Sequence, residues 1–136
     1  MRTIIILVGV VSFLLIGCSK SPVESTPVLL RIENAGIIAF DSVVVINPAG
    51  RQSYFNVGSN TKSVYKEFAF IYNYAYIKAY YGNQSAILQP IDYVGETKLT
   101  SGKFTYKIVV VSNLTLNGIL LENKKGEWVK WQMWFQ

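Results

Sequence analysis

The chain has no histidine and a single cysteine, Cys18, among its 136 residues. Without histidine, the Ser-His-Asp and Cys-His arrangements of nucleophilic enzymes and His-ligated zinc sites are excluded. With one cysteine the chain forms no internal disulfide, so a folded domain must be held together by its hydrophobic core. We therefore expect a protein that is not an enzyme and that needs no metal or cofactor.

Charge is also sparse. The chain has 13 basic and 8 acidic residues, for a formal net charge of +5, and Lys124 and Lys125 are the only adjacent basic pair. Nucleic-acid binding requires basic residues gathered into a stripe or patch. The dispersed charge therefore predicts no nucleic-acid partner.

What the chain does have is an apolar run from Ile4 to Ile16, which follows the positively charged start Met1-Arg2. A membrane-spanning helix needs about 20 apolar residues, so this run is short for one and matches the apolar region of a signal peptide. Gly17 supplies the small residue that a signal peptidase needs beside its cut. We predict that residues 1–17 are a signal peptide, and an uncleaved membrane anchor is the alternative.

The end of this run, Leu14-Leu15-Ile16-Gly17-Cys18, resembles the lipobox of exported bacterial lipoproteins, Leu-x-Gly-Cys. The resemblance implies that the Cys18 sulfur carries a diacylglycerol, that the chain is cut before Cys18, and that the new amino group is acylated. Two or three acyl chains anchor a protein to a membrane durably. A serine directly after the cysteine, as at Ser19, resembles the sequence of lipoproteins sorted to the outer membrane. Some lipoproteins displayed on the cell surface have an acidic cluster in the linker, and its absence here favours the periplasmic face of that membrane.

Residues 18–27 are expected to be a lipidated linker, because Ser19 to Pro27 is polar and contains two prolines. Fully extended, this stretch reaches roughly 25–30 Å. Residues 28–136 are long enough for one domain with a core and too short for two.

From Val28 onward, apolar residues recur at every second position, which is typical of strands with one covered face. Turn residues such as Asn47-Pro48-Ala49-Gly50 separate the segments. About nine short strands predict an all-β fold, either an antiparallel β-sandwich or a small barrel. The expected strands are Val28–Glu33, Phe40–Asn47, Gln52–Val57, two within Val64–Tyr81 that meet near Asn73, Ser85–Gln89, Lys103–Val111, Leu114–Glu122 and Trp128–Phe135.

The segment Leu99-x-x-Gly102-x-Phe104-x-Tyr106 resembles the turn-into-strand segment of immunoglobulin-like and fibronectin-type-III-like sandwiches. In those sandwiches an aromatic residue early in a late strand closes a corner. The resemblance covers about ten residues and implies architecture alone, because the disulfide of antibody domains has no counterpart here.

Aromatic residues are the first candidates for a binding site. A row of Tyr74, Tyr76 and Tyr80 facing solvent would stack on sugar rings or on the backbone of a partner protein. The alternative is that these rings only cover a sheet face. Near the end of the chain, Trp128 and Trp134 are expected either in a contact patch or at the membrane interface beside the anchor.

The segment Ile91 to Thr97 is expected to be a loop, and it carries Asp92, Tyr93 and Glu96. Two acids in one loop are a candidate acid pair or cation site, and the alternative is an ordinary solvated loop. We expect no metal here, because no Asp-x-Asp run supplies the several oxygens that calcium needs.

The sequence therefore favours a lipoprotein anchored in the outer membrane that acts as a non-enzymatic binding or structural module of the cell envelope, with a glycan or an envelope protein as its partner. Three alternatives stay open. One is an inhibitor of a lysozyme-type hydrolase, and another is a hydrolase that uses Asp92 and Glu96. The third is a subunit of a surface fibre or secretion assembly, which an unpaired edge strand beside the linker would favour.

Overall fold

The structure is a computed structural model that describes residues 26–90, 97–112, 114–124 and 127–131. In these residues the chain forms nine β-strands and no helix, so the predicted all-β fold is confirmed. The strands are β1 (Val28–Asn34), β2 (Phe40–Asn47), β3 (Gly50–Val57), β4 (Lys66–Phe68), β5 (Tyr76–Tyr81), β6 (Gln84–Leu88), β7 (Gly102–Ser112), β8 (Thr115–Lys124) and β9 (Glu127–Trp131).

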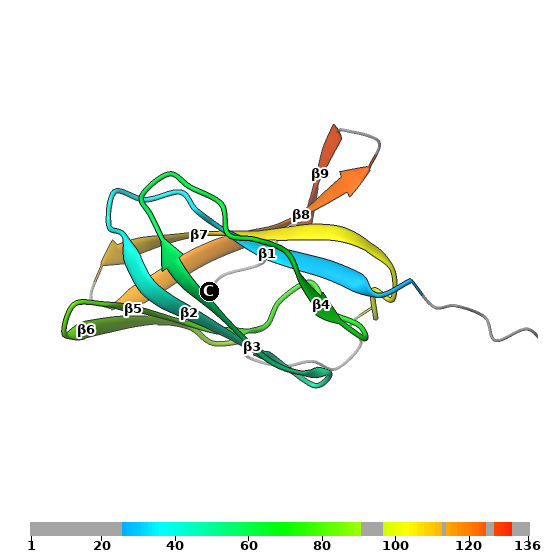
Figure 1. Cartoon of the computed structure of the whole chain (residues 1–136), viewed down its shortest axis with the longest axis horizontal. Helices are drawn as coiled ribbons and strands as arrows, with labels where there is room; N and C mark the ends of the chain where they lie inside the picture. Colours follow the sequence, from blue (N-terminus) through cyan, green and yellow to red (C-terminus); the bar gives the residue numbers. More distant parts are fainter. Residues whose placement is uncertain (1–25, 91–96, 113, 125–126, 132–136) are drawn as a thin grey trace, which may run out of the picture.

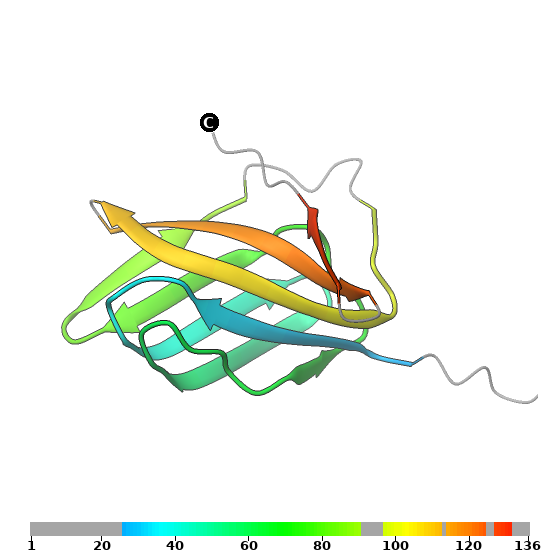
Figure 2. The same cartoon turned by 90° about the horizontal axis from the view of Figure 1, so that it is seen from above.

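The strands form two layers that are joined into one sheet. Figure 1 shows β1, β7 and β8 above β2, β3, β5 and β6, and Figure 2 shows the upper layer from above. The hydrogen-bonded order is β3-β2-β5-β6-β8-β7-β1-β4, with β9 paired to β8. The two ends of this path approach each other where the Gln52 side chain donates to the Glu67 carbonyl across 3.3 Å. The fold is thus a sandwich that is nearly closed into a small barrel.

The alternation read from the sequence decides which residues enter the core. In β1 every second residue is buried, and the others are half-buried. In β7 Phe104, Tyr106 and Ile108 are buried together, as the alternation of the strand requires. Burying an aliphatic or aromatic side chain contributes about 1.5–3 kcal/mol, so these residues supply the stabilisation that no disulfide provides. The other large core side chains include Phe40, Tyr54, Ile71, Ile77, Leu116 and Leu120.

Two tight turns connect neighbouring strands, and the first is the turn predicted at Asn47-Pro48-Ala49-Gly50. Asn47 and Gly50 face each other across Pro48-Ala49, and the Asn47 side-chain oxygen accepts a hydrogen bond from the Ala49 amide at 2.8 Å. Gly82 has a φ of 54°, which glycine adopts without steric cost, and it connects β5 to β6 in antiparallel pairing.

The chain departs from expectation between Val64 and Ala75. The alternating pattern predicts two strands meeting near Asn73, but the first is only β4, three residues long. After β4 the chain forms a single bridge between Ile71 and Leu99 instead of a ladder. The apolar residues of this segment are needed to cap the core, because Ile71 and Ala75 are fully buried outside any long strand.

The pairing also differs from a purely antiparallel sandwich. β1 runs parallel to β7 along its whole length, and β6 meets β8 in parallel at Ile87 and Thr115. Parallel neighbours require long connections, and here the intervening strands provide them. The β6–β8 pairing joins the two layers into one sheet, whereas the β1–β7 pairing lies within the upper layer.

The Tyr106 side chain makes a contact between segments far apart in the sequence, not a contact within a local corner of the chain. Its hydroxyl donates to the Tyr72 carbonyl at 2.8 Å, 34 residues earlier in the chain. The aromatic residue predicted to close a corner thus ties β7 to the irregular segment before β5. Within the described ranges, no helix is long and apolar enough to cross a membrane.

Candidate functional site

The outer surface of β3, β2, β5 and β6 carries several exposed apolar and aromatic side chains. Its residues alternate along each strand with the buried residues of the core. The pairing registers set them in rows across the four strands. We call this surface the aromatic face, and its outward residues are Arg51, Ser53, Phe55, Ser42, Val44, Ile46, Tyr76, Lys78, Tyr80, Ser85 and Ile87.

Four large side chains of the aromatic face are open to solvent. Phe55 is 68% exposed, and Ile46, Tyr80 and Ile87 are 38%, 37% and 36% exposed. Single exposed apolar residues are normal on a protein surface, whereas several on one continuous sheet face mark a contact site. The aromatic face is therefore the first candidate for a binding surface.

The charged side chains in these rows are Arg51 and Lys78. β2 also carries one exposed carboxylate, Asp41, which accepts a hydrogen bond from the Gly82 amide at 2.8 Å. The Lys78 ammonium lies 4.9 Å from the centre of the Tyr80 ring, within the range of a cation–π interaction. Rings of this kind present flat apolar surfaces with polar edges, and the serines between them offer hydroxyl groups for hydrogen bonds.

The three predicted tyrosines do not form one row. Tyr76 and Tyr80 lie on the outer side of β5, opposite Ile46 and Ser42 of β2. Tyr74 precedes β5, is half-buried and packs against the core. The structure thus brings Tyr76 and Tyr80 together on the aromatic face and places Tyr74 elsewhere.

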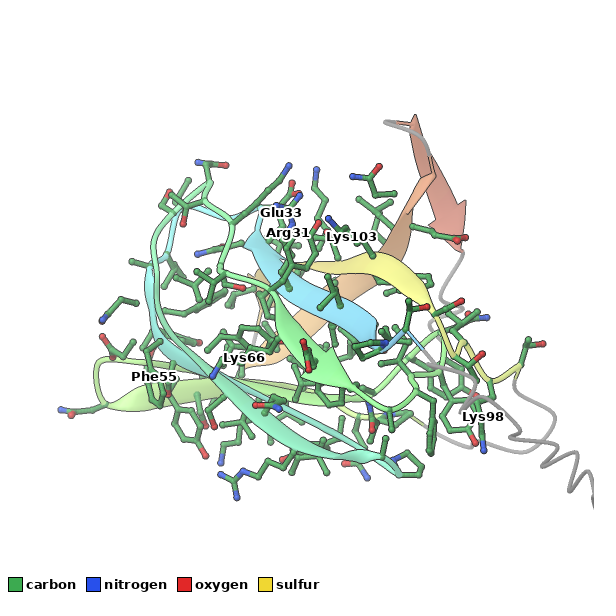
Figure 3. All side chains as sticks on the ribbon, turned by 45° about the vertical axis from the view of Figure 1, so that its right-hand side comes forward. Arg31, Glu33, Phe55, Lys66, Lys98 and Lys103 are labelled. Carbon is green, nitrogen blue, oxygen red and sulfur yellow. The ribbon has the colours of Figure 1, made fainter. Side chains whose placement is uncertain are left out.

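The other layer carries charged residues on its outer side, and its strand β7 also has one exposed apolar residue, Val111, at 54%. Figure 3 shows Arg31, Glu33 and Lys103 gathered over β1 and β7, away from Phe55. The Arg31 guanidinium lies 4.6 Å from the Tyr65 ring centre, and the Lys103 ammonium lies 5.8 Å from it on the same layer. Glu33 pairs with two lysines that flank it, Lys62 at 3.4 Å and Lys107 at 3.3 Å.

The pKa of the Tyr54 hydroxyl is clearly shifted. Burial in the core raises the pKa of its hydroxyl well above the usual value, because the charged phenolate would lose its water. The neutral hydroxyl donates to the Leu30 carbonyl at 2.9 Å. Tyr54 therefore connects β3 to β1 and is a structural residue.

A hollow of about 600 Å³ opens at the end of the sandwich where β1 ends. Its lining is mainly apolar, with the Gln84 amide and the Tyr81 hydroxyl as side-chain polar groups, and Ile38 and Leu114 are exposed. Ile37, next to Ile38 in the loop between β1 and β2, is 90% exposed. The residues that line the hollow are Ile38, Tyr81, Gln84, Val110 and Leu114.

Several predicted site residues lie outside what the structure describes: Cys18, Asp92, Tyr93, Glu96 and Trp134. The backbone of Trp128 is described, and it pairs with Asn123 between β9 and β8. Over the described residues, no group of three or more acidic or cysteine side chains is placed to hold a metal ion.

Comparison with known proteins adds no relative. No protein-family model, curated protein or solved structure matches the chain. The site is therefore argued from its own geometry.

The sequence reasoning missed Phe55, the most exposed residue of the aromatic face. A signal was present, because Tyr54 and Phe55 are adjacent in a strand and neighbouring side chains point to opposite faces. One of the two rings had to face outward. The exposed Ile37 was also missed, since a loop position gives no periodic signal.

Proposed function

We propose that this protein is a lipid-anchored, non-enzymatic binding module of the bacterial cell envelope, and that the aromatic face is its contact surface. The observation that carries the proposal is the exposure of Phe55, Tyr80, Ile46 and Ile87 on one continuous sheet face. Contact surfaces are enriched in aromatic residues and depleted in acidic ones, and this face has that composition.

The chemistry of the aromatic face suits a glycan or an envelope protein. Tyrosine and phenylalanine rings stack on the apolar faces of sugar rings and on flat peptide groups. The serine hydroxyls between them pair with hydroxyl or amide groups of the partner. Because Lys78 and Arg51 are the charged residues in the rows, and Asp41 of β2 is engaged by the Gly82 amide, neutral or acidic partners are favoured over basic ones.

The proposed cellular location follows from the lipobox. A diacylglycerol on Cys18 would hold the domain at the outer membrane, on its periplasmic face, through the linker up to Pro27. β1 begins at Val28, directly after that linker, at the right-hand end in Figure 1. An anchor at this position leaves the aromatic face unobstructed by the attachment point.

Binding is tested with a panel of glycans, peptidoglycan fragments and purified envelope proteins. For a ligand bound by the parent protein, we expect Tyr80→Ala and Tyr76→Ala each to weaken binding about tenfold, equivalent to about 1.4 kcal/mol. Tyr65→Ala removes a tyrosine from the other layer and serves as the matched control, with affinity unchanged. Equal affinity of all three variants, or no binding to any member of the panel, would overturn the proposal.

The anchor is tested separately by intact mass of the protein purified from membranes. We expect the chain to begin at Cys18 and to carry the added mass of a diacylglycerol and an acyl chain, and Cys18→Ala to remove that mass. A chain that begins at Met1, or a free thiol at Cys18, would exclude the lipoprotein assignment.

A further inference from the structure

Strand β3 is an open edge of the sheet. It is one end of the strand path, and seven of its eight residues pair with β2, on one side only. At the other end of the path, β4 contacts β3 through the Gln52 side chain and forms no described ladder with it. An open edge strand is a ready template for another strand.

The geometry of the hairpin shows which backbone groups the edge presents. Asn47 and Gly50 face each other across a two-residue turn, so they are a hydrogen-bonded type of pair. Such pairs recur at every second residue of an antiparallel ladder. The N–H and C=O groups of Arg51, Ser53 and Phe55 therefore point away from β2, toward the open edge.

The straight part of this edge is symmetric about Ser53. It is bounded on one side by Gly50, with a φ of 137°, and on the other by Asn56, with a φ of 53°, and neither is ordinary strand backbone. The extended stretch is therefore Arg51 to Phe55, with Ser53 at its centre.

We propose that two copies of this protein pair through β3, antiparallel, about a two-fold axis at Ser53. This register places Ser53 opposite the Ser53 of the second copy, and each Arg51 opposite a Phe55. All three residues of the edge then exchange backbone hydrogen bonds, and the exposed Phe55 ring receives an arginine, the pairing favoured by cation–π attraction. The inference does not depend on the lipid anchor or on the ligand of the aromatic face.

Self-complementarity is the reason to choose a second copy over another partner. A two-fold interface requires that the same patch fit itself, and Arg51-x-Ser53-x-Phe55 does so in this register. An axis at Arg51 would instead put two arginines directly opposite each other, which is unfavourable. Pairing would also join two aromatic faces into one surface that continues across both copies.

The first test is a charge exchange, measured by sedimentation equilibrium of the full-length protein over a concentration series. Phe55→Lys places a lysine opposite Arg51 of the second copy, and we expect dimerisation to weaken at least about tenfold. Combining Arg51→Glu with Phe55→Lys restores an attractive pair, so the double variant should dimerise again. Ile46→Lys, on the same face but on β2, is the matched control and should dimerise as the parent does. A parent that remains monomeric up to about 1 mM, or a double variant without rescue, would overturn the proposal.

The second test fixes the register with cysteines and a mild oxidant. Directly opposite residues in a hydrogen-bonded antiparallel pair have Cα atoms about 5.5 Å apart, within disulfide range. Ser53→Cys should therefore form a covalent dimer by itself. Arg51→Cys and Phe55→Cys should not, because two copies of either position lie about 13 Å apart, yet a mixture of these two variants should cross-link. Ser85→Cys on β6 is the control, because its cross-linking rate measures random collisions between copies. Cross-linking of Ser53→Cys at the Ser85→Cys rate, or dominant capture of a different protein, would contradict the dimer.

Discussion

At the scale of single residues, two tyrosine hydroxyls explain how a polar atom is tolerated in this core. Tyr54 and Tyr106 are both almost fully buried, and each donates to a backbone carbonyl far away in the chain, Leu30 and Tyr72 respectively. A buried polar group costs free energy unless it is paired, and pairing with a distant segment also fixes the fold. The ring supplies buried apolar area, and the hydroxyl supplies the connection.

Tyr54→Phe removes one of these connections and leaves the ring in place. We expect the free energy of unfolding to fall by about 1–2 kcal/mol, because the Leu30 carbonyl loses its donor inside the core. Urea denaturation measures the change. Tyr80→Phe, which alters a hydroxyl on the exposed aromatic face, is the matched control and should shift stability by less than about 0.5 kcal/mol.

The raised pKa of Tyr54 makes stability depend on alkaline pH. The unfolded state releases this proton at its ordinary value, near pH 10, whereas the folded state holds it to higher pH. Above about pH 10 the unfolded state therefore binds fewer protons, and stability falls as pH rises. Tyr54→Phe should lose this contribution, so its unfolding free energy should fall less steeply between pH 10 and 12 than that of the parent protein, by up to about 1.4 kcal/mol per pH unit. Equal slopes in denaturant titrations of the two proteins would contradict the assignment.

At the scale of elements, the alternation of apolar residues predicted the strands well wherever one face is buried. β1, β2, β5 and β7 lie where the pattern places them, because burial of one face is a local property of the sequence. The parallel meeting of β1 with β7 was not predicted, since strand pairing depends on contacts between distant residues. The same reason explains the short β4. Its alternating pattern predicts a longer strand, but β4 pairs only with Val28 to Leu30 of β1.

The candidate site was predicted in the same incomplete way. Tyr76 and Tyr80 could be placed on one side of β5 from their spacing alone. That Phe55 of β3 lies on the same face as Tyr80 follows only from the order β3-β2-β5, with Ser42 between the two rings. Alternation predicts a face for each strand, and only the assembled sheet shows which faces are continuous.

Gly118 shows how closely the strands approach around β8. A Cβ atom at this position would lie 3.0 Å from the Ile108 side chain, 3.2 Å from the Lys107 carbonyl oxygen and 3.4 Å from the Leu88 side chain. The backbone oxygen has little freedom to move, so Gly118→Ala should destabilise the protein by about 1–3 kcal/mol. Thermal unfolding measures the loss. Asn117→Ala, at the neighbouring exposed position, should leave the midpoint nearly unchanged, and an equally stable Gly118→Ala would show that β8 can shift.

At the scale of the whole molecule, the domain has two different ends. β1 begins at Val28 at one end, and the loop between β1 and β2 lies at the opposite end (Figures 1 and 2). This loop carries the exposed Ile37 and also Ile38, which lines the hollow together with Leu114. The open edge of β3 runs along the side between these ends. Antiparallel pairing about a two-fold axis reverses one copy relative to the other, so the two linker ends lie at opposite ends of the pair. Both linkers can reach one membrane when the two-fold axis stands along the membrane normal and the β3 strands lie along the surface.

Anchoring should accordingly promote the pairing of β3 strands. Confinement to a surface raises the effective concentration of one copy around another, so a weak contact becomes more populated without any new interaction. We expect Ser53→Cys to cross-link at least about tenfold faster in membranes than in the Cys18→Ala background, which would leave the chain free in solution at the same total concentration. Midpoints of thermal unfolding should agree between the two backgrounds, because the core begins at Val28, beyond the anchor. If Ser53→Cys cross-links equally fast with and without the Cys18→Ala change, and Cys18 carries no lipid, the lipid anchor is refuted and the β3 pairing is not. If Ser53→Cys cross-links only as fast as Ser85→Cys, both in membranes and in solution, the β3 pairing is refuted and the anchor is not.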